Sequence, residues 1–250
     1  MKYSAVLTSI LTAAFFLTGC ESAYEMTNAD PSPLTSFLPD HQLLKDQKAS
    51  FPFRRFWYDK NIDWNRFTKI KIDPVSISYM LSDTWWQQVN PGKVGSMRED
   101  AVQIASFMQN AFVCAIQQDP CCNLSVTDTV DKQTIVVRLA IVKLVPTKAY
   151  LDAAGTVAGF LIPGASLVNI LNHGTVAMEG MLVDGGDNRI VAMFTDTEKD
   201  ESAIIDINGL TWYGHARDII RNWGKEFADL SETNDPEKLK KPFPFTLISI

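Results

Sequence analysis

The sequence predicts one α/β domain, of the α+β type, in which two main amphipathic helices pack on a mixed β-sheet. Three observations predict it. Residues 96–118 and 212–230 carry apolar side chains at helical spacing. Residues 134–145 form a β-branched run, apolar enough for a central strand that is buried on both faces. Residues 174–184 and 188–197 flank a turn as the arms of a hairpin would. A sheet with helices packed on it is the economical way to bury all these apolar faces.

The first twenty residues indicate where the protein is located. Lys2 precedes an apolar run, residues 5–17, that is too short to span the ~30 Å of a bilayer core. Leu17-Thr18-Gly19-Cys20 follows and resembles the lipobox of bacterial lipoproteins, whose cysteine is acylated before cleavage. By this resemblance, residues 1–19 are a signal peptide, cut between Gly19 and Cys20, and Cys20 carries the lipid. The alternatives are an ordinary secretory signal with an incidental cysteine, or an uncleaved signal anchor.

The resemblance implies a protein held in the cell envelope through palmitate-type chains. Several acyl chains exceed the single chain that gives only marginal membrane binding. Glu21 follows the cysteine, where Asp typically retains lipoproteins at the inner membrane, so we expect an outer-membrane protein that faces the periplasm. The net charge of −6 becomes −7 when Lys2 is removed with the signal peptide. An acidic chain without clustered bases predicts no nucleic-acid partner.

Three cysteines remain for the folded domain: Cys114, Cys121 and Cys122. In an oxidising periplasm we expect Cys114 to pair with one of the other two, across Asp119-Pro120. The third thiol would be free and buried, or would pair between chains. A metal site is a weak alternative, because two adjacent cysteines do not easily bind one ion.

Residues 20–34 are small, polar or proline, which predicts a lipidated, flexible tether. The periplasmic domain is expected at 35–232 and a C-terminal tail at 233–250. Residues 51–64 are dense in aromatic side chains and indicate a loop whose rings cover one edge of the core. The alternative is a contact surface for a glycan or a partner, formed by Trp57, Trp85 and Trp86.

Residues 67–79 alternate as a strand does, and the alternation shifts by one at Asp73-Pro74, which indicates a bulge or an edge position. Asn90-Pro91-Gly92 predicts a turn. Ser96 and Glu99 then form a capping box for the helix 96–118, and Asp119-Pro120 ends it. A short strand is expected at Leu124 and Val126.

Residues 149–171 carry no charge after Asp152, and Pro163-Gly164 divides them into halves too short to cross a membrane. Three interpretations are open: short core-packed helices or an apolar loop, an oligomerisation or partner surface, and a membrane-inserting hairpin. The surface would include Gly155, Phe160, Leu161 and Pro163.

No catalytic motif is found in the sequence. It contains no G-x-S-x-G, glycine-rich phosphate loop, H-E-x-x-H or C-x-x-C. His173 could form a metal or acid–base site with Glu179 or Asp196, but a lone histidine is more often solvated or structural. The carboxylates around Asp184 to Glu201 fit no EF-hand spacing. We therefore expect no catalytic residue, no metal and no cofactor.

Several stretches together resemble one family of bacterial lipoproteins, the domain of unknown function DUF3313. They are the lipobox, Ser36-Phe37-Leu38-Pro39-Asp40, Ile72-Asp73-Pro74-Val75, Val136-Val137-Arg138-Leu139-Ala140-Ile141, and Ala177-Met178-Glu179-Gly180 with the hairpin that ends in Asp196. The resemblance implies a lipid-anchored periplasmic α/β domain and transfers no catalytic residue.

Three functions follow as hypotheses. The first is a non-enzymatic lipoprotein that binds an envelope protein or forms a homo-oligomer, with residues 153–171 as the interface. The second is a lipoprotein that binds a small molecule, glycan or peptide through exposed aromatic side chains. The third is an envelope enzyme without a recognisable motif.

Overall fold

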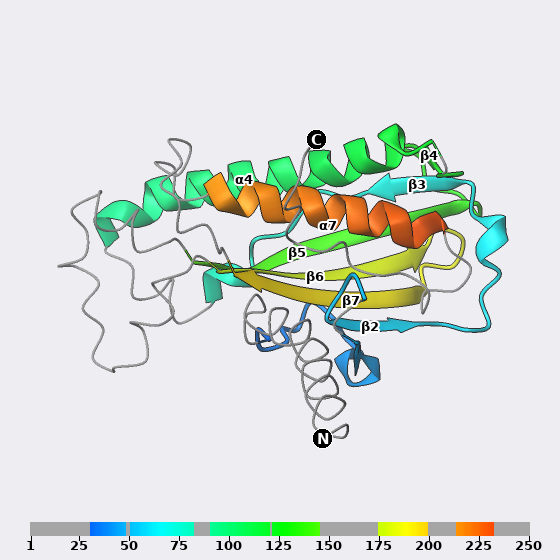
Figure 1. The fold of residues 1–250 in the computed structure, drawn as a ribbon, viewed down its shortest axis with the longest axis horizontal. Helices are drawn as coiled ribbons and strands as arrows, with labels where there is room; N and C mark the ends of the chain where they lie inside the picture. The colour runs from blue at the N-terminus through cyan, green and yellow to red at the C-terminus, as the bar shows by residue number, and fades with distance from the viewer. Residues whose placement is uncertain are drawn as a thin grey trace, which may run out of the picture.

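One mixed sheet is the framework of the domain in a computed structural model, which describes residues 31–48, 51–82, 91–120, 122–145, 175–199 and 214–232. Within these residues seven strands lie in the order β1-β2-β7-β6-β5-β3-β4 (Figure 1). The strands are β1 (Lys45–Asp46), β2 (Arg55–Tyr58), β3 (Lys69–Ile72), β4 (Ser125–Val126), β5 (Thr134–Val145), β6 (Thr175–Asp184) and β7 (Ile190–Lys199). The single mixed α/β domain predicted from the sequence is confirmed.

The centre of the sheet is antiparallel and follows the predicted elements closely. β5 has the predicted bounds and is buried along nearly its whole length. β6 and β7 form the predicted hairpin, in which Gly180 pairs with Phe194. The turn places Asn188 at a φ of 60°, a left-handed conformation that asparagine tolerates.

The two sides of the sheet depart from the predictions. Residues 55–58, which we expected in a loop, form β2 and pair antiparallel with β7, so the loop is wrong for this segment. The expected packing of its rings on the core is confirmed for Phe56 and Tyr58. β3 is parallel to β5 and ends at Ile72, because the proline at position 74 has no N–H to continue the ladder. An isolated parallel bridge between Ser76 and Ala140 is what remains of the longer predicted strand.

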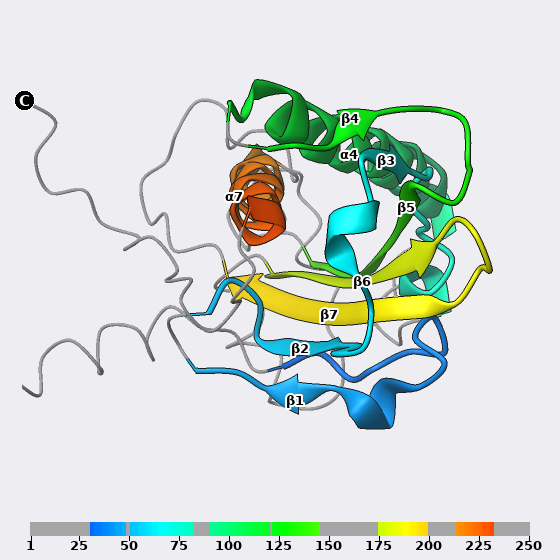
Figure 2. The same cartoon turned by 90° about the vertical axis from the view of Figure 1, so that its right-hand side faces the viewer.

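Two helices, α4 (Pro91–Gln118) and α7 (Gly214–Glu232), cover one face of the sheet. They lie side by side and run in the same direction, so that both end at the same side of the domain (Figures 1 and 2). The turn predicted at Asn90-Pro91-Gly92 is wrong for residues 91 and 92, because the helix begins at Pro91. Proline is favoured at a first helical position, where its missing N–H has no partner to lose.

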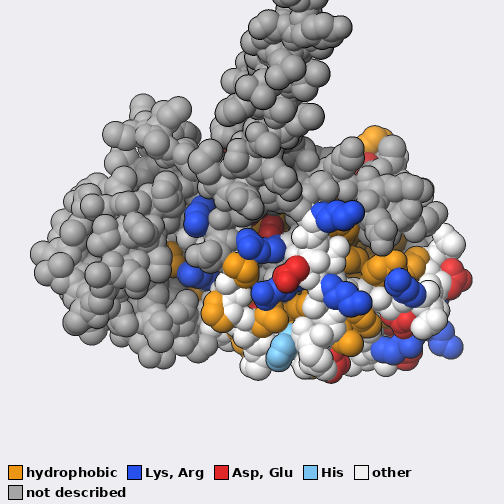
Figure 3. All heavy atoms as spheres, turned by 60° about the horizontal axis from the view of Figure 1, so that its bottom comes forward, with side chains coloured by type: hydrophobic (Ala, Val, Ile, Leu, Met, Phe, Trp, Pro, Cys, Tyr) orange, Lys and Arg blue, Asp and Glu red, His pale blue; other side chains and the backbone are white. Residues whose placement is uncertain are grey.

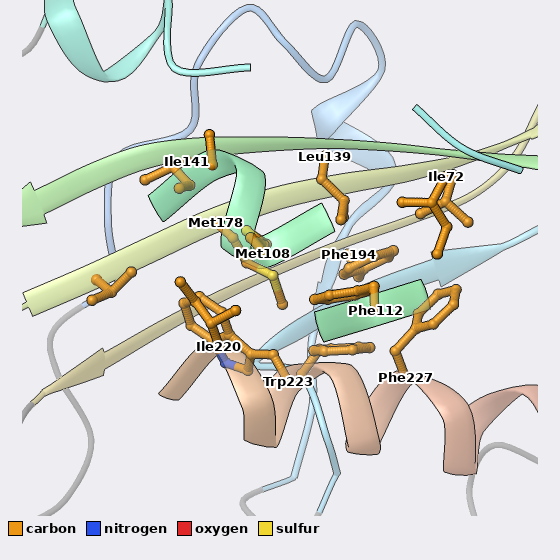
Figure 4. Close-up of a cluster of buried hydrophobic side chains, with 14 of the residues drawn as sticks. Ile72, Met108, Phe112, Leu139, Ile141, Met178, Phe194, Ile220, Trp223 and Phe227 are labelled. Carbon is orange, nitrogen blue, oxygen red and sulfur yellow. The ribbon is translucent and has the colours of Figure 1, made fainter. Parts of the chain in front are cut away.

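The main core lies between these helices and the sheet. Figure 4 shows aromatic and aliphatic side chains of both layers meeting there, among them Phe112, Phe194, Trp223 and Phe227. A Cβ at position 180 would lie 2.2 Å from the ring of Phe194, so the glycine makes room for that ring. The Trp223 indole donates to Asp196 Oδ2 at 2.8 Å, which satisfies a buried N–H of α7 from the sheet.

The opposite face of the sheet is covered by residues 31–44, which we name the N-terminal strap. Leu38 is fully buried against Val136, Met181 and Met193. The strap includes η1 (His41–Leu43), a single 3-10 turn. Ser32 N donates to Thr197 Oγ1 at 3.1 Å, so contacts with the sheet begin before residue 35, where we expected the domain to start. Figure 3 shows this side, with basic side chains scattered among acidic and apolar ones.

Candidate functional site

A pocket of about 400 Å³ opens at the end of the domain where α4 and α7 end. Its floor is the helix-covered face of the sheet, and it includes Ile70, Ile135 and Leu182. The last turns of α7 form its roof. One wall is η2 (Trp64–Arg66), the short cyan helix that crosses this end of the sheet in Figure 2. This hollow is the candidate functional site.

Aromatic side chains surround the pocket. Side chains on a strand alternate between faces, so Phe56 and Tyr58 of β2 both reach the pocket, whereas Trp57 points to the strap side. Asp63 Oδ1 accepts from Asn65 N at 3.1 Å and caps η2. The five rings that line the pocket come from the floor, the wall and the roof: Phe56, Tyr58, Trp64, Phe67 and Phe227.

The polar groups that line the pocket are uncharged: Asn65, Thr68, Asn123 and Ser231. Asn123 follows α4, and Ser231 lies in the last turn of α7. The hydroxyl of Ser231 lies 3.4 Å from Cys122 Sγ, which places a half-buried thiol beside the pocket. These groups offer hydrogen bonds to a ligand.

An ion pair holds the wall of the pocket to the sheet. The guanidinium of Arg66 pairs with the carboxylate of Asp184, which is 1% exposed. Asp184 Oδ1 also accepts from Gly186 N at 2.8 Å, in the turn between β6 and β7. Arg66 lies over the Phe67 ring, 4.6 Å from its centre. η2 is therefore joined to the hairpin turn by charge and by stacking.

Acidic groups lie near the roof of the pocket. Asp119 directly follows α4, and Asp229 belongs to the last turn of α7. Partial burial raises the pKa of Asp229, and the nearby charge of Asp119 raises it further. Since the carbonyl groups at the end of a helix also carry partial negative charge, this end of the domain favours positive charge.

A second buried carboxylate lies on the strap side of the sheet. Glu179 is 1% exposed and accepts hydrogen bonds from Thr35 N and Thr35 Oγ1, both at 2.7 Å. Burial raises the pKa of Glu179, and the hydrogen bonds from Thr35 oppose that rise. Glu179 and Asp196 lie on opposite faces of the sheet, because Asp196 contacts Trp223. They cannot belong to one site.

The structure places only some of the residues predicted for a site. Trp57 is half-buried in the apolar cluster under the strap, away from the pocket. Residues Gly19, Cys20, Trp85, Trp86, Cys121, His173 and the segment 153–171 lie outside the described residues. We expected a disulfide between Cys114 and one of the other two cysteines. The structure describes Cys114 and Cys122 as free thiols, so these two are not bonded to each other.

The sequence analysis missed most of the pocket. Tyr58 and Trp64 lie in the aromatic-dense segment, but their common location depends on the alternation of β2, which we did not predict. Nothing in the sequence around Phe227, Asn123 or Ser231 indicated that these residues line a pocket. In the described part of the chain, no three His, Cys, Asp or Glu side chains could hold a metal ion together. Nor is any helix there long and apolar enough to cross a bilayer.

The fold and the pocket define a single-domain α/β protein with a hollow between the sheet and its helices. Residues 34–227 match the model of DUF3313, described as a protein of unknown function, so the chain belongs to this family.

Two solved structures are similar at a low level. The PelC dodecamer from Paraburkholderia phytofirmans has a TM-score of 0.35 and 11% identity, and the match covers 70% of this chain and 95% of that chain. Protein XCC0632 from Xanthomonas campestris, of the family DUF330, has a TM-score of 0.38 and 11% identity, over 66% and 83% of the two chains. Neither similarity bears on the function of this protein. A search of the curated proteins finds no match.

Proposed function

We propose that this chain is a lipid-anchored protein of the bacterial cell envelope whose domain binds a small molecule in the aromatic pocket. One observation carries the proposal: a pocket of about 400 Å³ bordered by five rings. Ligand sites are typically about 300–1,000 Å³, mostly apolar, with a few polar groups that orient the ligand. Asn65, Thr68, Asn123 and Ser231 supply those polar groups.

Partly exposed rings supply the binding energy in this proposal. Tyr58 and Trp64 are half-buried in the free protein. A ligand that covers them removes apolar surface from water, at about 25 cal/mol for each Å². Among the three hypotheses from the sequence, the pocket therefore favours ligand binding through aromatic side chains. Assembly with a partner or a second copy through residues 153–171 stays a prediction.

The position of the strap is compatible with an anchor at Cys20. The residues 21–30 separate that cysteine from the first described residue, Pro31. Eleven residue steps reach at most about 36–40 Å when fully extended. The chain meets the domain on the strap side, whereas the pocket lies on the helix side. An anchored domain can therefore keep its pocket open to the periplasm.

Binding can be tested with N-phenyl-1-naphthylamine, an uncharged aromatic probe whose fluorescence rises in apolar surroundings. We expect Tyr58→Leu and Trp64→Leu to weaken its binding about three- to tenfold, because each removes a ring that the probe contacts. Trp57→Leu is the matched control, since its ring lies on the other face of the sheet. Equal affinity for all three variants and the wild type would exclude the pocket as the site.

A thiol probe offers an independent test. In a Cys121→Ser background, bound N-phenyl-1-naphthylamine should slow the alkylation of Cys122, beside the pocket, and leave the exposed Cys114 unaffected. Slowing at both cysteines, or at neither, would argue against the pocket.

The anchor needs a separate experiment. Cells labelled with radioactive palmitate should incorporate the label into the wild-type chain and into a Cys114→Ser control. A Cys20→Ser variant should stay unlabelled and leave the membrane fraction. Labelling that survives in Cys20→Ser would refute the anchor without affecting the proposed pocket.

A further inference from the structure

We propose that the pocket prefers an organic cation, an amphipathic amine or quaternary ammonium compound whose apolar part lies among the rings. This inference rests on the proposed binding function and adds the chemical class of the ligand. It is argued from the rings, from the direction of the two helices and from the charges beside the pocket.

Aromatic residues border the pocket on several sides. Aromatic faces carry negative potential and attract cations that lie within about 6 Å of the ring centre. Phe56 and Tyr58 lie in the floor, Trp64 in the wall and Phe227 in the roof. A cation that meets the faces of several of these rings would be attracted by each of them. Tryptophan and tyrosine are stronger partners than phenylalanine for this interaction.

The helix directions add to the same preference. α4 and α7 run in parallel and end at the same side of the domain (Figure 1). The last turns of α7 line the pocket, and so do Asn123 and Leu124, which follow α4. The last carbonyl groups of a helix have no partner within the helix and carry about half a negative charge in total. The end of α7 at the pocket, with the end of α4 on the same side of the domain, favours a cation and disfavours an anion.

Side-chain charges near the pocket point the same way. Asp119 directly follows α4, Asp229 lies in the last turn of α7, and Asp63 precedes Trp64. The basic neighbours are Arg66, whose charge is compensated by Asp184 and whose guanidinium lies over Phe67, and Lys69, which pairs with Asp131 at 2.6 Å. The exposed Lys225 lies one turn before Asp229. Like Asp63, Asp119 and Asp229, it does not line the pocket.

Three probes of similar size and different charge test the inference. The cation 4-phenylbutyltrimethylammonium, the neutral 4-phenylbutan-1-ol and the anion 4-phenylbutyrate would each compete with N-phenyl-1-naphthylamine on the wild-type protein. We expect the cation to bind about tenfold more tightly than the alcohol, and the carboxylate to bind more weakly than both.

Charge variants separate electrostatic preference from shape. The double variant Asp119→Asn with Asp229→Asn should weaken binding of the cation about threefold and leave binding of the alcohol unchanged, since exposed charges act weakly through water. Asp218→Asn, in the first half of α7, is the control with the same kind of charge change far from the pocket. Circular dichroism should show the same folded state for all variants.

The outcomes distinguish this inference from the proposed function. If the alcohol or the carboxylate binds as tightly as the cation, and Trp64→Leu weakens them all, the pocket binds ligands but the cation preference is wrong. If no probe depends on Tyr58 or Trp64, both proposals fail. Tighter binding of the cation that is lost in Trp64→Leu but kept in Trp57→Leu supports both.

Discussion

The two faces of the sheet are covered in different ways. On one face, α4 and α7 bury a layer of large side chains that includes Phe194, Trp223 and Phe227. On the other face lies the strap, in which Leu38 is the one buried residue among positions 31–44. The helix side is thick and aromatic, and it leaves a hollow where the helices end. The strap side is thin and depends on the buried Leu38, the partly buried Phe37 and Leu44, and a few hydrogen bonds.

The comparison shows that stability and function are unevenly distributed in this domain. A segment with few buried apolar contacts opens at a lower free energy than a packed core does. We therefore expect the strap to open locally while the helix side stays folded. Each change below tests that difference, from the largest expected effect to the smallest.

A phenylalanine from each side gives the most direct comparison. Phe194→Ala should lower the free energy of unfolding by about 4 kcal/mol, because it leaves a cavity among Phe53, Phe227 and the helices. Phe37→Ala removes a half-buried ring of the strap and should cost about 1 kcal/mol. Urea denaturation of both variants checks this, and equal losses would contradict the proposed difference between the faces.

Gly180→Ala tests how tightly the helix side is packed. The new methyl group would overlap the Phe194 ring, which itself stacks on Phe53, so we expect a loss of about 2 kcal/mol. Gly95→Ala is the control, because Gly95 lies in α4 and a Cβ at this position would meet no atom within 4 Å. That change should stabilise the protein by about 0.5–1 kcal/mol, as measured by thermal unfolding.

Thr35→Val should affect the strap alone. It removes the hydroxyl, which donates to Glu179 and accepts from Phe37 N at 3.1 Å, and keeps the shape of the side chain. We expect local opening to become easier by about 1–2 kcal/mol. Hydrogen exchange should speed up at residues 31–44 and stay unchanged in α4 and α7. Faster exchange in the helices as well would show that the strap does not open independently.

Glu179→Gln should change how stability depends on pH. Burial raises the pKa of Glu179 above its ordinary value of 4.5. The folded protein then retains a proton that the unfolded chain releases, so stability from this group is full below pH 4.5 and falls as the pH rises through the raised pKa. Urea midpoints measured from pH 4 to 7 should fall less steeply in the variant. An identical slope would show that Glu179 does not titrate in this range.

Asp131→Asn should have the smallest effect, because Asp131 is exposed in the loop before β5. Hydrogen bonds from Lys69, Thr134 and the Gln133 backbone lower the pKa of Asp131 to about 2. Stability from this group is therefore present above the ordinary pKa of 3.8 and is lost as the pH falls toward 2. The difference between wild type and variant should shrink over that interval in acid titrations followed by fluorescence.

The elements predicted best from the sequence carry strong local patterns. β5 is a long β-branched run, and the turn between β6 and β7 contains glycine and asparagine, so pairing partners were not needed to find them. α7 continues to Glu232, two residues beyond the predicted end, and the predicted residues 212 and 213 lie outside the described residues. The start of α4 was missed because Pro91-Gly92 and Gly95 are poor helix formers, and Ser96 offered a competing cap.

The elements that we did not predict from the sequence depend on contacts with distant segments of the chain. β2 has four residues and becomes a strand by pairing with β7, a case in which tertiary context decides the local conformation. The pocket is composed in the same way, since Tyr58, Asn123 and Ser231 come from three separate parts of the chain. We expected the first residues of the strap, 31–34, to belong to a flexible tether. Nothing in the composition of the strap indicated that Thr35 would form hydrogen bonds with the buried carboxylate of Glu179.

The hydrogen bonds of the strap have a mechanical consequence. A force on the N-terminal end of the chain would act first on the hydrogen bonds of Ser32 and Thr35. The strap would detach before the force acted on the strands of the sheet. Release of residues 31–44 would add up to about 46–50 Å of reach to whatever holds that end. The domain could thus move farther from its point of attachment while the helices and the pocket kept their shape.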